Sequence, residues 1–455
     1  MPNPSDSPSD APTCDVVVLI PHPEDPGAFL CDATSNGSLL RLPSVTVEAE
    51  PSIESVIKRL DELLATRLVL LRANAVKWYD NYDTSAMVVE TESPSSEPSP
   101  AFEWASVGAT SDVAPEWAQP SVASWLGERR SGWSRLRPQW SRPGWVAEAG
   151  AWMRERMELA GLADAEIPQV HYVWGISMVL VADSRDGKAF LKCSGQRFQH
   201  EAAVTQALAS HTPSHLPEVL AIEPDRGWLL MRDFDGEELG MRESSTWGVG
   251  LDVLGTLQRH WLRRSSELLD LGAEHRPLTA LAKWVEQTAE NGDLLSPMTA
   301  DDRRRWLEVV PVMTDACLRL DAVGPGETLV HGDFHPYNVA IQSNGDAIVF
   351  DWSDTSVAHP ALDVVTYVMR AHDFDVRKAL FDRYFAGWDG AFGDQLDDDF
   401  VRLVLSVGAV HQAHTYTQIL PTVMPEDLSN LEGGDVQWLR RAMAYADTGL
   451  ATPVM

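Results

Sequence analysis

The chain has 455 residues, enough for about three domains and a sizeable core, which excludes peptide toxins and single small modules. Its 36 Lys and Arg against 67 Asp and Glu give a formal net charge of −31. A surface this acidic repels phosphate backbones and anionic lipid heads, so we expect neither a nucleic-acid partner nor a membrane partner. It would attract small cationic molecules instead.

The cysteines and the apolar segments predict a cytoplasmic protein. Four scattered cysteines form no Cys-x-x-Cys pair, which argues against a disulfide framework and a zinc ribbon. The N-terminal stretch carries aspartate rather than basic residues, and its apolar run of six residues is too short for a signal peptide. No segment reaches the roughly 18 apolar residues that a membrane helix needs.

The first part of the chain reads as a disordered Ser/Pro/Asp-rich tail, residues 1–13, followed by a small α+β domain, residues 14–129. Strands are predicted at residues 15–20, 38–50 and 86–92, a helix at 53–68, and a Ser/Pro-rich loop at 93–101. With strands around one helix, this domain vaguely resembles a Nudix-type fold. Enzymes of that family need a glycine-led helix with a cluster of metal-binding glutamates, and here the helix has only Glu54 and Glu62. The resemblance therefore implies a degenerate domain that has lost its catalysis.

A junction rich in tryptophan and arginine follows at residues 130–144. Basic residues that alternate with aromatic ones can bind single-stranded nucleic acid. The alternative, which we favour, is that the tryptophans pack against both neighbouring domains while the arginines pair with the acidic surface.

Residues 145–235 are predicted to form a small β-rich lobe, and residues 236–455 a larger, mainly helical lobe. In the first lobe, helices are predicted at residues 145–161 and 196–211, and strands at 169–174, 177–184, 188–193, 219–224 and 227–234. In the second lobe, helical patterns dominate except for a strand-loop-strand insert at residues 327–351. The predicted fold class is therefore α+β, with two lobes preceded by a small domain.

The most informative stretch is LVHGDFHPYNVAIQSNGDAIVFDW, residues 329–352. It reads as a strand, a polar loop, a second strand, a turn, and a third strand that ends at Asp351. The hairpin would carry Asp351 back beside Asp333 and Asn338. One carboxylate can accept the proton of an attacking hydroxyl, while the other carboxylate and the amide oxygen can hold Mg²⁺ against a triphosphate. These are the parts needed for phosphoryl transfer.

This stretch resembles the signature of the aminoglycoside phosphotransferase and choline kinase family, small-molecule kinases with a protein-kinase-like fold. The family pattern His-Gly-Asp-x-His-x-x-Asn is met in full by His331, Gly332, Asp333, His335 and Asn338. The resemblance implies that Asp333 is the catalytic base, that Asn338 and Asp351 bind Mg²⁺, and that His331 braces the loop. It also implies ATP as the phosphoryl donor.

The resemblance implies nucleotide contacts in the smaller lobe. Lys192 would grip the α- and β-phosphates, and Glu201 would hold Lys192. Backbone groups from Met231 to Asp233 would read an adenine edge. The phosphate-covering loop has only Gly175, Ile176 and Ser177 instead of a glycine-rich run, so we expect its amides and the Ser177 hydroxyl to hold phosphate.

Further polar residues follow the motif. Asp363 is predicted to brace the catalytic loop from the first turn of a helix, and Asp354 to face either the substrate or solvent. His411 and His414 lie one helical turn apart, but no third ligand is visible, so a core or pocket-lining role is predicted rather than a metal site.

The sequence thus predicts an ATP-dependent, Mg²⁺-dependent phosphotransferase that acts on a hydroxyl of a small molecule. An amino sugar, an aminoglycoside or a related polar polyol is the expected acceptor, and the net charge of −31 favours a cationic one. Two alternatives stay open: a kinase of a neutral sugar or other metabolite, and a nucleotide-binding pseudokinase without turnover. A protein kinase is disfavoured because the sequence has no Asp-Phe-Gly motif and no Ala-Pro-Glu motif after the HGDFHPYN loop.

Overall fold

The structure is a computed structural model that divides into two compact units. The first unit is Met1–Asp186 together with Val423–Asn430, and the second is Gly187–Thr422 together with Leu431–Met455. The described residues are 13–25, 27–33, 39–48, 53–66, 68–78, 84–92, 100–106, 112–393 and 396–453. The predicted disordered tail, apart from residue 13, and residues 93–99 of the predicted loop lie outside these ranges. The predicted domain boundaries stay a prediction.

The first unit is built on a four-stranded sheet with the order β4-β1-β6-β5. Its strands are β1 (Thr13–Leu19), β4 (Ser44–Glu48), β5 (Val69–Trp78) and β6 (Thr84–Glu92). The central strand β1 runs parallel to β6 and antiparallel to β4. From Val16 to Leu19 the strand is buried at successive positions, as expected for a central strand covered on both faces. Among the described residues, β2 (Ala28–Asp32) also pairs with β7 (Phe102–Ser106), and β3 (Leu39–Arg41) pairs with β8 (Asp112–Ala114).

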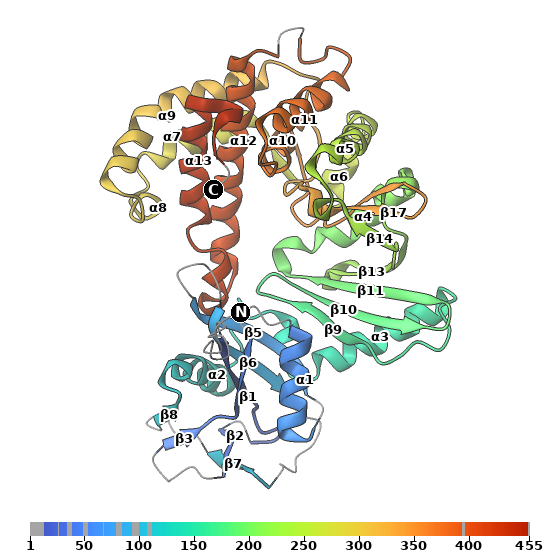
Figure 1. The fold of residues 1–455 in the computed structure, drawn as a ribbon, viewed down its shortest axis with the longest axis vertical. Helices are drawn as coiled ribbons and strands as arrows, with labels where there is room; N and C mark the ends of the chain where they lie inside the picture. The colour runs from blue at the N-terminus through green and yellow to red at the C-terminus, as the bar shows by residue number, and fades with distance from the viewer. Residues whose placement is uncertain are drawn as a thin grey trace, which may run out of the picture. The chain divides into compact units, whose positions relative to one another are not determined.

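The described residues of this unit include the α-helices α1 (Ile53–Leu64), α2 (Gln119–Ser131) and α3 (Trp145–Leu159). In Figure 1, α1 and α2 are drawn on opposite sides of the sheet. The helix predicted to reach residue 68 ends at Leu64. Ala65 takes a left-handed conformation, and the Asp61 carboxylate accepts a hydrogen bond from the Leu68 amide at 2.7 Å, which turns the chain into β5. Strand β5 and helix α2 were not predicted from the sequence.

The core of this unit joins α2 to the sheet. Trp125 and Val122 of α2 are buried together with Val17, Phe29 and Val88. Such burial of large apolar side chains is the main stabilising contribution to a domain of this kind. Helix α2 therefore contributes to the hydrophobic core through Trp125 and Val122.

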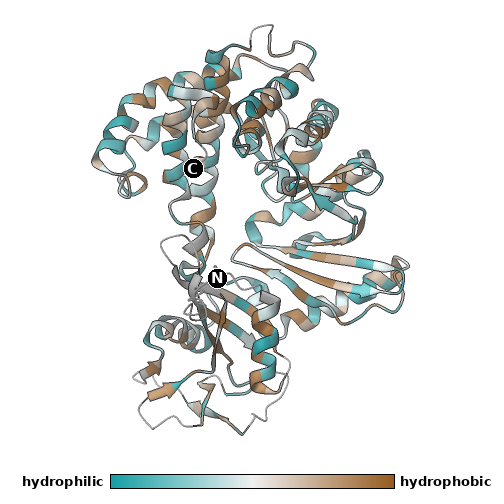
Figure 2. Cartoon of the chain, in the orientation of Figure 1, coloured by the Kyte–Doolittle hydropathy of each residue, from teal (hydrophilic) through white to brown (hydrophobic). Residues whose placement is uncertain are grey.

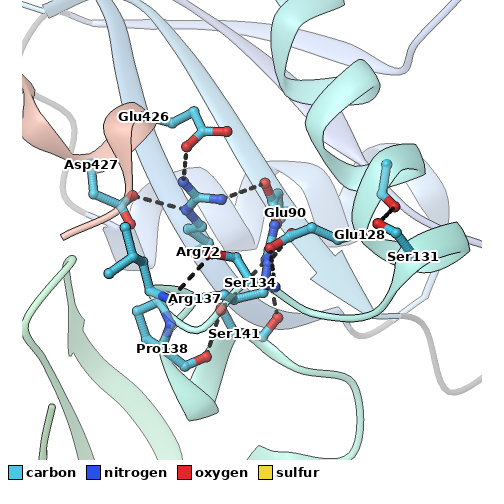
Figure 3. Close-up of polar contacts among 12 residues, drawn as sticks. Arg72, Glu90, Glu128, Ser131, Ser134, Arg137, Pro138, Ser141, Glu426 and Asp427 are labelled. Atoms are coloured by element: carbon cyan, nitrogen blue, oxygen red, sulfur yellow. Dashed lines mark hydrogen bonds and ion pairs between the residues drawn. The ribbon is translucent and has the colours of Figure 1, made fainter. Parts of the chain in front are cut away.

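Buried charges lie beside this core (Figure 3). Arg137 forms ion pairs with Glu128 and, at 2.9 Å, with Glu90, and its guanidinium lies 5.1 Å from the centre of the Trp125 ring. Glu90 also pairs with Arg72 at 3.2 Å. The prediction that the arginines of the junction pair with the acidic surface holds only in part for Arg137. Arg137 does pair with carboxylates, but these carboxylates are buried and are not on the surface.

The first unit ends in an antiparallel pair, β9 (Gln169–Val173) and β10 (Ser177–Ser184). The second unit begins with β11 (Gly187–Ser194), which pairs antiparallel with β13 (Trp228–Arg232); β13 in turn pairs with β12 (Val219–Glu223). Figure 2 shows hydrophobic residues along β11 and β13. Helix α4 (His200–His211) follows β11. These strands and α4 fall where the sequence predicts them.

The rest of the second unit is mainly helical, as predicted. Its helices are α5 (Gly248–Trp261), α6 (Ser265–Asp270), α7 (Leu278–Thr288), α8 (Gly292–Leu295), α9 (Ala300–Asp321), α10 (Val364–Val368), α11 (Phe374–Ala386), α12 (Asp398–Ile419) and α13 (Gly434–Thr448). Helices α12 and α13 run side by side (Figure 1). One small sheet joins β15 (Glu274–Arg276), β19 (Ser356–Ala358) and β16 (Thr328–Val330); another joins β14 (Gly236–Glu238), β17 (Val339–Gln342) and β18 (Ala347–Val349). Among the described residues, no helix is both long and apolar enough to cross a bilayer.

Candidate active site

The hairpin predicted around the motif is present. Strand β16 leads into the loop of residues 331–338, β17 follows the loop, and β18 returns antiparallel to β17. The amide of Phe350 donates to the carbonyl oxygen of Asn338 at 3.1 Å. Asn338 is the last residue of the loop, and Asp351 directly follows Phe350. This bond therefore places Asp351 beside the end of the loop.

Asp333 and Asn338 are tied together inside the loop. The side-chain amide of Asn338 donates from Nδ2 to the carbonyl oxygen of Asp333 at 3.0 Å. This bond fixes the amide so that its oxygen is the atom left for a cation. The Asp333 side chain is 51% exposed, and its Oδ2 lies 3.6 Å from Nε2 of His335. Surrounding protein would raise the pKa of Asp333, but the hydrogen bond and charge of His335 lower it below its ordinary value.

Lys192 joins two carboxylates from distant parts of the sequence. Its Nζ lies 2.7 Å from Oε1 of Glu201 and 2.7 Å from Oδ1 of Asp351. Ser194 donates to the other oxygen of Glu201 at 2.6 Å. The pair that the sequence predicts on β11 and α4 is therefore formed, and it is linked to the hairpin through Asp351.

The electrostatics of this group follow from the close pairing. Burial alone would lower the pKa of Lys192, but Asp351 and Glu201 hold it above its ordinary value. Burial would likewise raise the pKa of Asp351, but the Lys192 ammonium and the Ser353 hydroxyl keep it well below its usual range. Asp351 also takes a left-handed backbone conformation, with φ +65°, which is rare for a residue with a side chain. The Asp351 carboxylate is thus ionised, and Lys192 and Ser353 fix its position by hydrogen bonds.

Two side chains form hydrogen bonds to the backbone of the loop of residues 331–338. The Asp363 carboxylate accepts hydrogen bonds from the amides of His331 and Gly332, both at 2.9 Å, and a third from Nε2 of Gln258 at 3.0 Å. Gln412 of α12 donates to the carbonyl oxygen of Gly332 at 2.6 Å. Asp363 therefore lies where a bracing residue should. Neither glutamine was predicted from the sequence: Gln412 lies 80 residues from its partner Gly332, and Gln258 lies 105 residues from its partner Asp363.

His331 is fully buried under the loop. Its Nε2 lies 3.0 Å from the carbonyl oxygen of Phe350, and its ring packs 4.6 Å from that of Trp352. Burial lowers the pKa of His331 to about 4, despite the hydrogen bond to Phe350. The imidazole is therefore neutral and ties the loop to the return strand.

Asp354 lies directly against the loop. A Cβ added at Gly332 would meet the carbonyl oxygen of Asp354 at 2.3 Å, and Gly332 has φ +89°, so only glycine fits there. Burial raises the pKa of Asp354 to about 7, with Asp333 adding to the rise and Arg276 opposing it.

Two arginines share one carboxylate near Asp354. Glu274 lies 2.9 Å from Arg197 and 2.8 Å from Arg276, and the Gln418 side-chain oxygen accepts from both guanidiniums. These two arginines were not predicted as site residues, because no local sequence pattern distinguishes them from other charged residues.

The remaining predicted residues are placed as follows. Met231 lies in β13, opposite Phe190 of β11. The amide of Asp233 donates to the carbonyl oxygen of Lys188 at 2.9 Å, so this amide is not free for an adenine edge. Ser177 begins β10 in the first unit, where its hydroxyl accepts from the Trp174 indole at 2.7 Å.

His411 and His414 fit the predicted core role. His411 is buried, and its Nε2 lies 3.4 Å from Nη1 of Arg276. The ring of His414 packs 4.8 Å from that of Trp284. Within the described ranges, no group of three or more His, Cys, Asp and Glu residues is arranged to hold a metal ion. A dedicated all-protein metal cage is therefore not found there.

The donor atoms do fit a magnesium ion that is bound together with phosphates. Mg²⁺ in such sites takes one or two carboxylates and completes its shell with water and phosphate oxygens. Asn338 supplies an amide oxygen whose nitrogen is fixed, and Asp351 supplies a carboxylate kept ionised by Lys192. Oxygen donors of this kind suit a hard cation.

Comparisons with known proteins found one family match and several similar proteins. Residues 177–398 match the phosphotransferase enzyme family. The uncharacterized protein YcbJ of Bacillus subtilis is 45% identical over 49 residues, which are 10% of this chain and 16% of that protein's length. Among solved structures, a choline/ethanolamine kinase family protein from Mesorhizobium loti is 15% identical with a TM-score of 0.47, covering 68% of this chain and 98% of that one. The choline kinase LicA from Streptococcus pneumoniae is 11% identical with a TM-score of 0.47, covering 66% of this chain and 99% of that one.

Proposed function

Residues 177–398 belong to the phosphotransferase enzyme family, and on this premise we propose that the chain is an ATP-dependent kinase of a hydroxyl group on a small molecule. The observation that supports it most is the hairpin that brings Asp333, Asn338 and Asp351 together, with Lys192 bound to Asp351 at 2.7 Å. The family match extends over the whole of this group.

Asp333 is the proposed catalytic base. Its carboxylate is half exposed and has a lowered pKa, so it is ionised at neutral pH and accessible to an acceptor hydroxyl. It would orient that hydroxyl and accept its proton as the bond to phosphorus forms. His331, Asp363 and Gln412 would act indirectly, by holding the loop that carries Asp333.

Lys192 is the proposed phosphate-binding cation. Glu201 holds the ammonium on one side, so that the lysine is oriented before the nucleotide arrives. Asn338 and Asp351 would hold Mg²⁺, which supplies positive charge to the triphosphate. Most of the rate enhancement would come from positioning and electrostatics, since the transferred phosphoryl group needs little covalent help.

As the acceptor we propose an amino sugar, an aminoglycoside or a related polar polyol, and as the compartment the cytoplasm. The net charge of −31 favours a cationic acceptor. The neighbourhood of Asp333 is more balanced: Arg197 and Arg276 face Glu274 and Asp354. This local balance favours a second candidate, a kinase of a neutral sugar or other metabolite.

The test is a screen of cationic and neutral polyols with Mg·ATP, scored by ADP release. The intact protein should release ADP with at least one acceptor, and Asp333→Asn should lower kcat by about 10²- to 10⁴-fold, the usual contribution of a catalytic base. Asp346→Asn, in the exposed turn of the same hairpin, is the matched control and should keep full activity. Turnover with neutral acceptors alone would select the second candidate. Nucleotide binding without turnover on any acceptor would instead indicate a pseudokinase.

A further inference from the structure

The first unit contains a cavity of about 610 Å³ that is lined by α1, the start of β5, α3 and the segment that leads into β9. Strand β9 contacts both α1 and β5. The ring of Pro168, just before β9, lies 3.5 Å from the position of a Cβ on Gly150 of α3, which is ordinary van der Waals contact. The elements around the cavity are therefore packed against one another. Small-molecule sites in proteins have volumes of roughly 300–1,000 Å³, and this cavity falls within that range.

The walls of the cavity are mainly apolar. Its lining includes Ile57 of α1, Leu70 of β5, Val146 of α3 and Val170 of β9. Ile167 also lines the cavity and is 63% exposed, so a large apolar side chain faces water there. Removing such surface from water drives binding, and the walls therefore favour a ligand with an apolar part.

Two basic side chains also line the cavity, Lys58 of α1 and Arg154 of α3. Both are exposed, and neither forms an ion pair with any side chain that the structure describes. Asp61 is the acidic residue among the described lining residues, and its Oδ1 accepts a hydrogen bond from the Leu68 amide at 2.7 Å. The charged groups of the lining thus favour an anion, although the whole chain has a formal net charge of −31.

We propose that this cavity binds a small amphipathic anion, a carboxylate with an alkyl chain. The alkyl chain would lie against the apolar walls, and the carboxylate would pair with Lys58 and Arg154. The lining residues lie outside residues 177–398, and none of them has a part in the proposed phosphoryl transfer. The inference therefore does not depend on the proposed kinase function.

The probe is decanoate, titrated into the full-length protein by isothermal titration calorimetry at neutral pH, where its carboxyl group is ionised. Octanoate is two methylenes shorter and should have a Kd about 15-fold higher, because each buried methylene changes the Kd roughly fourfold. Octylammonium has the same alkyl chain with the opposite charge and should bind about fivefold more weakly than octanoate. Octylammonium binding as tight as that of octanoate would overturn the inference.

Removal of the two basic groups tests the carboxylate contacts. Lys58→Gln combined with Arg154→Gln should raise the Kd for octanoate about fivefold, as expected for two exposed ion pairs, and should change the Kd for octan-1-ol less than about twofold. The matched control is Arg59→Gln combined with Arg130→Gln, which removes two exposed charges from α1 and α2 outside the cavity. It should bind octanoate as the wild type does. Equal affinities of the two double variants for octanoate would contradict the proposed site.

A filled cavity gives a second, independent test. Ala151 lines the cavity from an exposed position of α3, so the side chain of Ala151→Phe can occupy the cavity while the helix is kept. Decanoate should raise the Tm of the wild type, because a ligand of the folded state stabilises it, but should not raise the Tm of Ala151→Phe. Ala123→Phe, at an exposed position of α2 outside the cavity, is the matched control and should respond as the wild type does. The inference is wrong if the wild type does not bind decanoate, or if Ala151→Phe binds it equally well.

Discussion

The Lys192 ammonium lies 2.7 Å from the Asp351 carboxylate, so the proposed phosphate-binding cation and the proposed metal ligand form an ion pair. Glu201 completes the group at the same distance from Lys192. Two carboxylates and one ammonium leave one surplus negative charge, which a divalent cation would reverse. The group is therefore suited to receive Mg²⁺ together with a triphosphate.

The first prediction concerns Lys192. Lys192→Met keeps the length of the side chain but removes its charge, and should lower kcat/KM for ATP by about 10²- to 10³-fold, as expected when one preorganised electrostatic contact is lost. Lys192→Arg should not restore activity, because the planar guanidinium cannot replace the compact ammonium between two carboxylates. Initial rates measured against ATP concentration test this. Activity of Lys192→Met within threefold of the wild type would exclude the proposed role.

The second prediction concerns the brace under the catalytic loop. Asp363 is 1% exposed and accepts three hydrogen bonds, so Asp363→Ala should lower the free energy of unfolding by about 3 kcal/mol, since buried donors lose their partner. Urea unfolding measures this change. Asp373→Ala removes an exposed helix cap and serves as control, with an expected loss of about 1 kcal/mol. Equal losses in the two variants would contradict the brace.

The third prediction compares two glycines with nearly the same backbone conformation. Gly332 and Gly345 have φ +89° and +90°, so alanine strains both by about 1–2 kcal/mol. At Gly332 the added Cβ would also meet the Asp354 carbonyl oxygen at 2.3 Å, whereas at Gly345 nothing lies within 4 Å. Gly332→Ala should therefore lower the Tm much more than Gly345→Ala, and only Gly332→Ala should reduce kcat. Differential scanning calorimetry and initial rates test the two parts.

The fourth prediction concerns pH. Burial lowers the pKa of His414 to about 4, while the unfolded chain binds this proton near pH 6.5. The contribution of His414 to stability is therefore fully present above pH 6.5 and is lost as the pH falls towards 4. Relative to His414→Gln, the free energy of unfolding of the wild type should fall by about 1–2 kcal/mol between pH 7.5 and pH 5.

The His414 comparison removes the other titrating groups from the difference. Asp363, whose pKa burial raises to about 7, acts in the opposite direction and is present in both proteins. Urea midpoints at the two pH values give the result. A wild type that gains stability relative to His414→Gln in acid would show that the imidazole is charged in the folded state.

The sequence predicted the centre of the site because that centre is local. Asp333, Asn338 and Asp351 lie within 19 residues of one another, and a hairpin with a clear turn signal brings them together. Lys192 and Glu201 lie nine residues apart on a strand and the helix that follows it, so their pairing could also be predicted from the sequence. Their catalytic roles stay predictions until they are measured.

The supports of the site could not be found in this way. Gln412 and Gln258 meet partners 80 and 105 residues away, and no local pattern marks a residue for such a contact. The elements missed in the first unit have a local cause. The strand β5 follows α1 without glycine or proline, and the charged and aromatic residues of α2 hide its helical period.

The return of Val423–Asn430 to the first unit affects how the protein can be dissected. A fragment that starts at Gly187 would keep Glu426 and Asp427 but lose Arg72, leaving two acids without their counterion. A fragment of residues 1–186 would lose the same two acids, both of which pair with Arg72. Recombinant halves cut at residue 187 should therefore aggregate or unfold, whereas a cut in the exposed turn of Asn344 to Asp346 should leave this charge network whole.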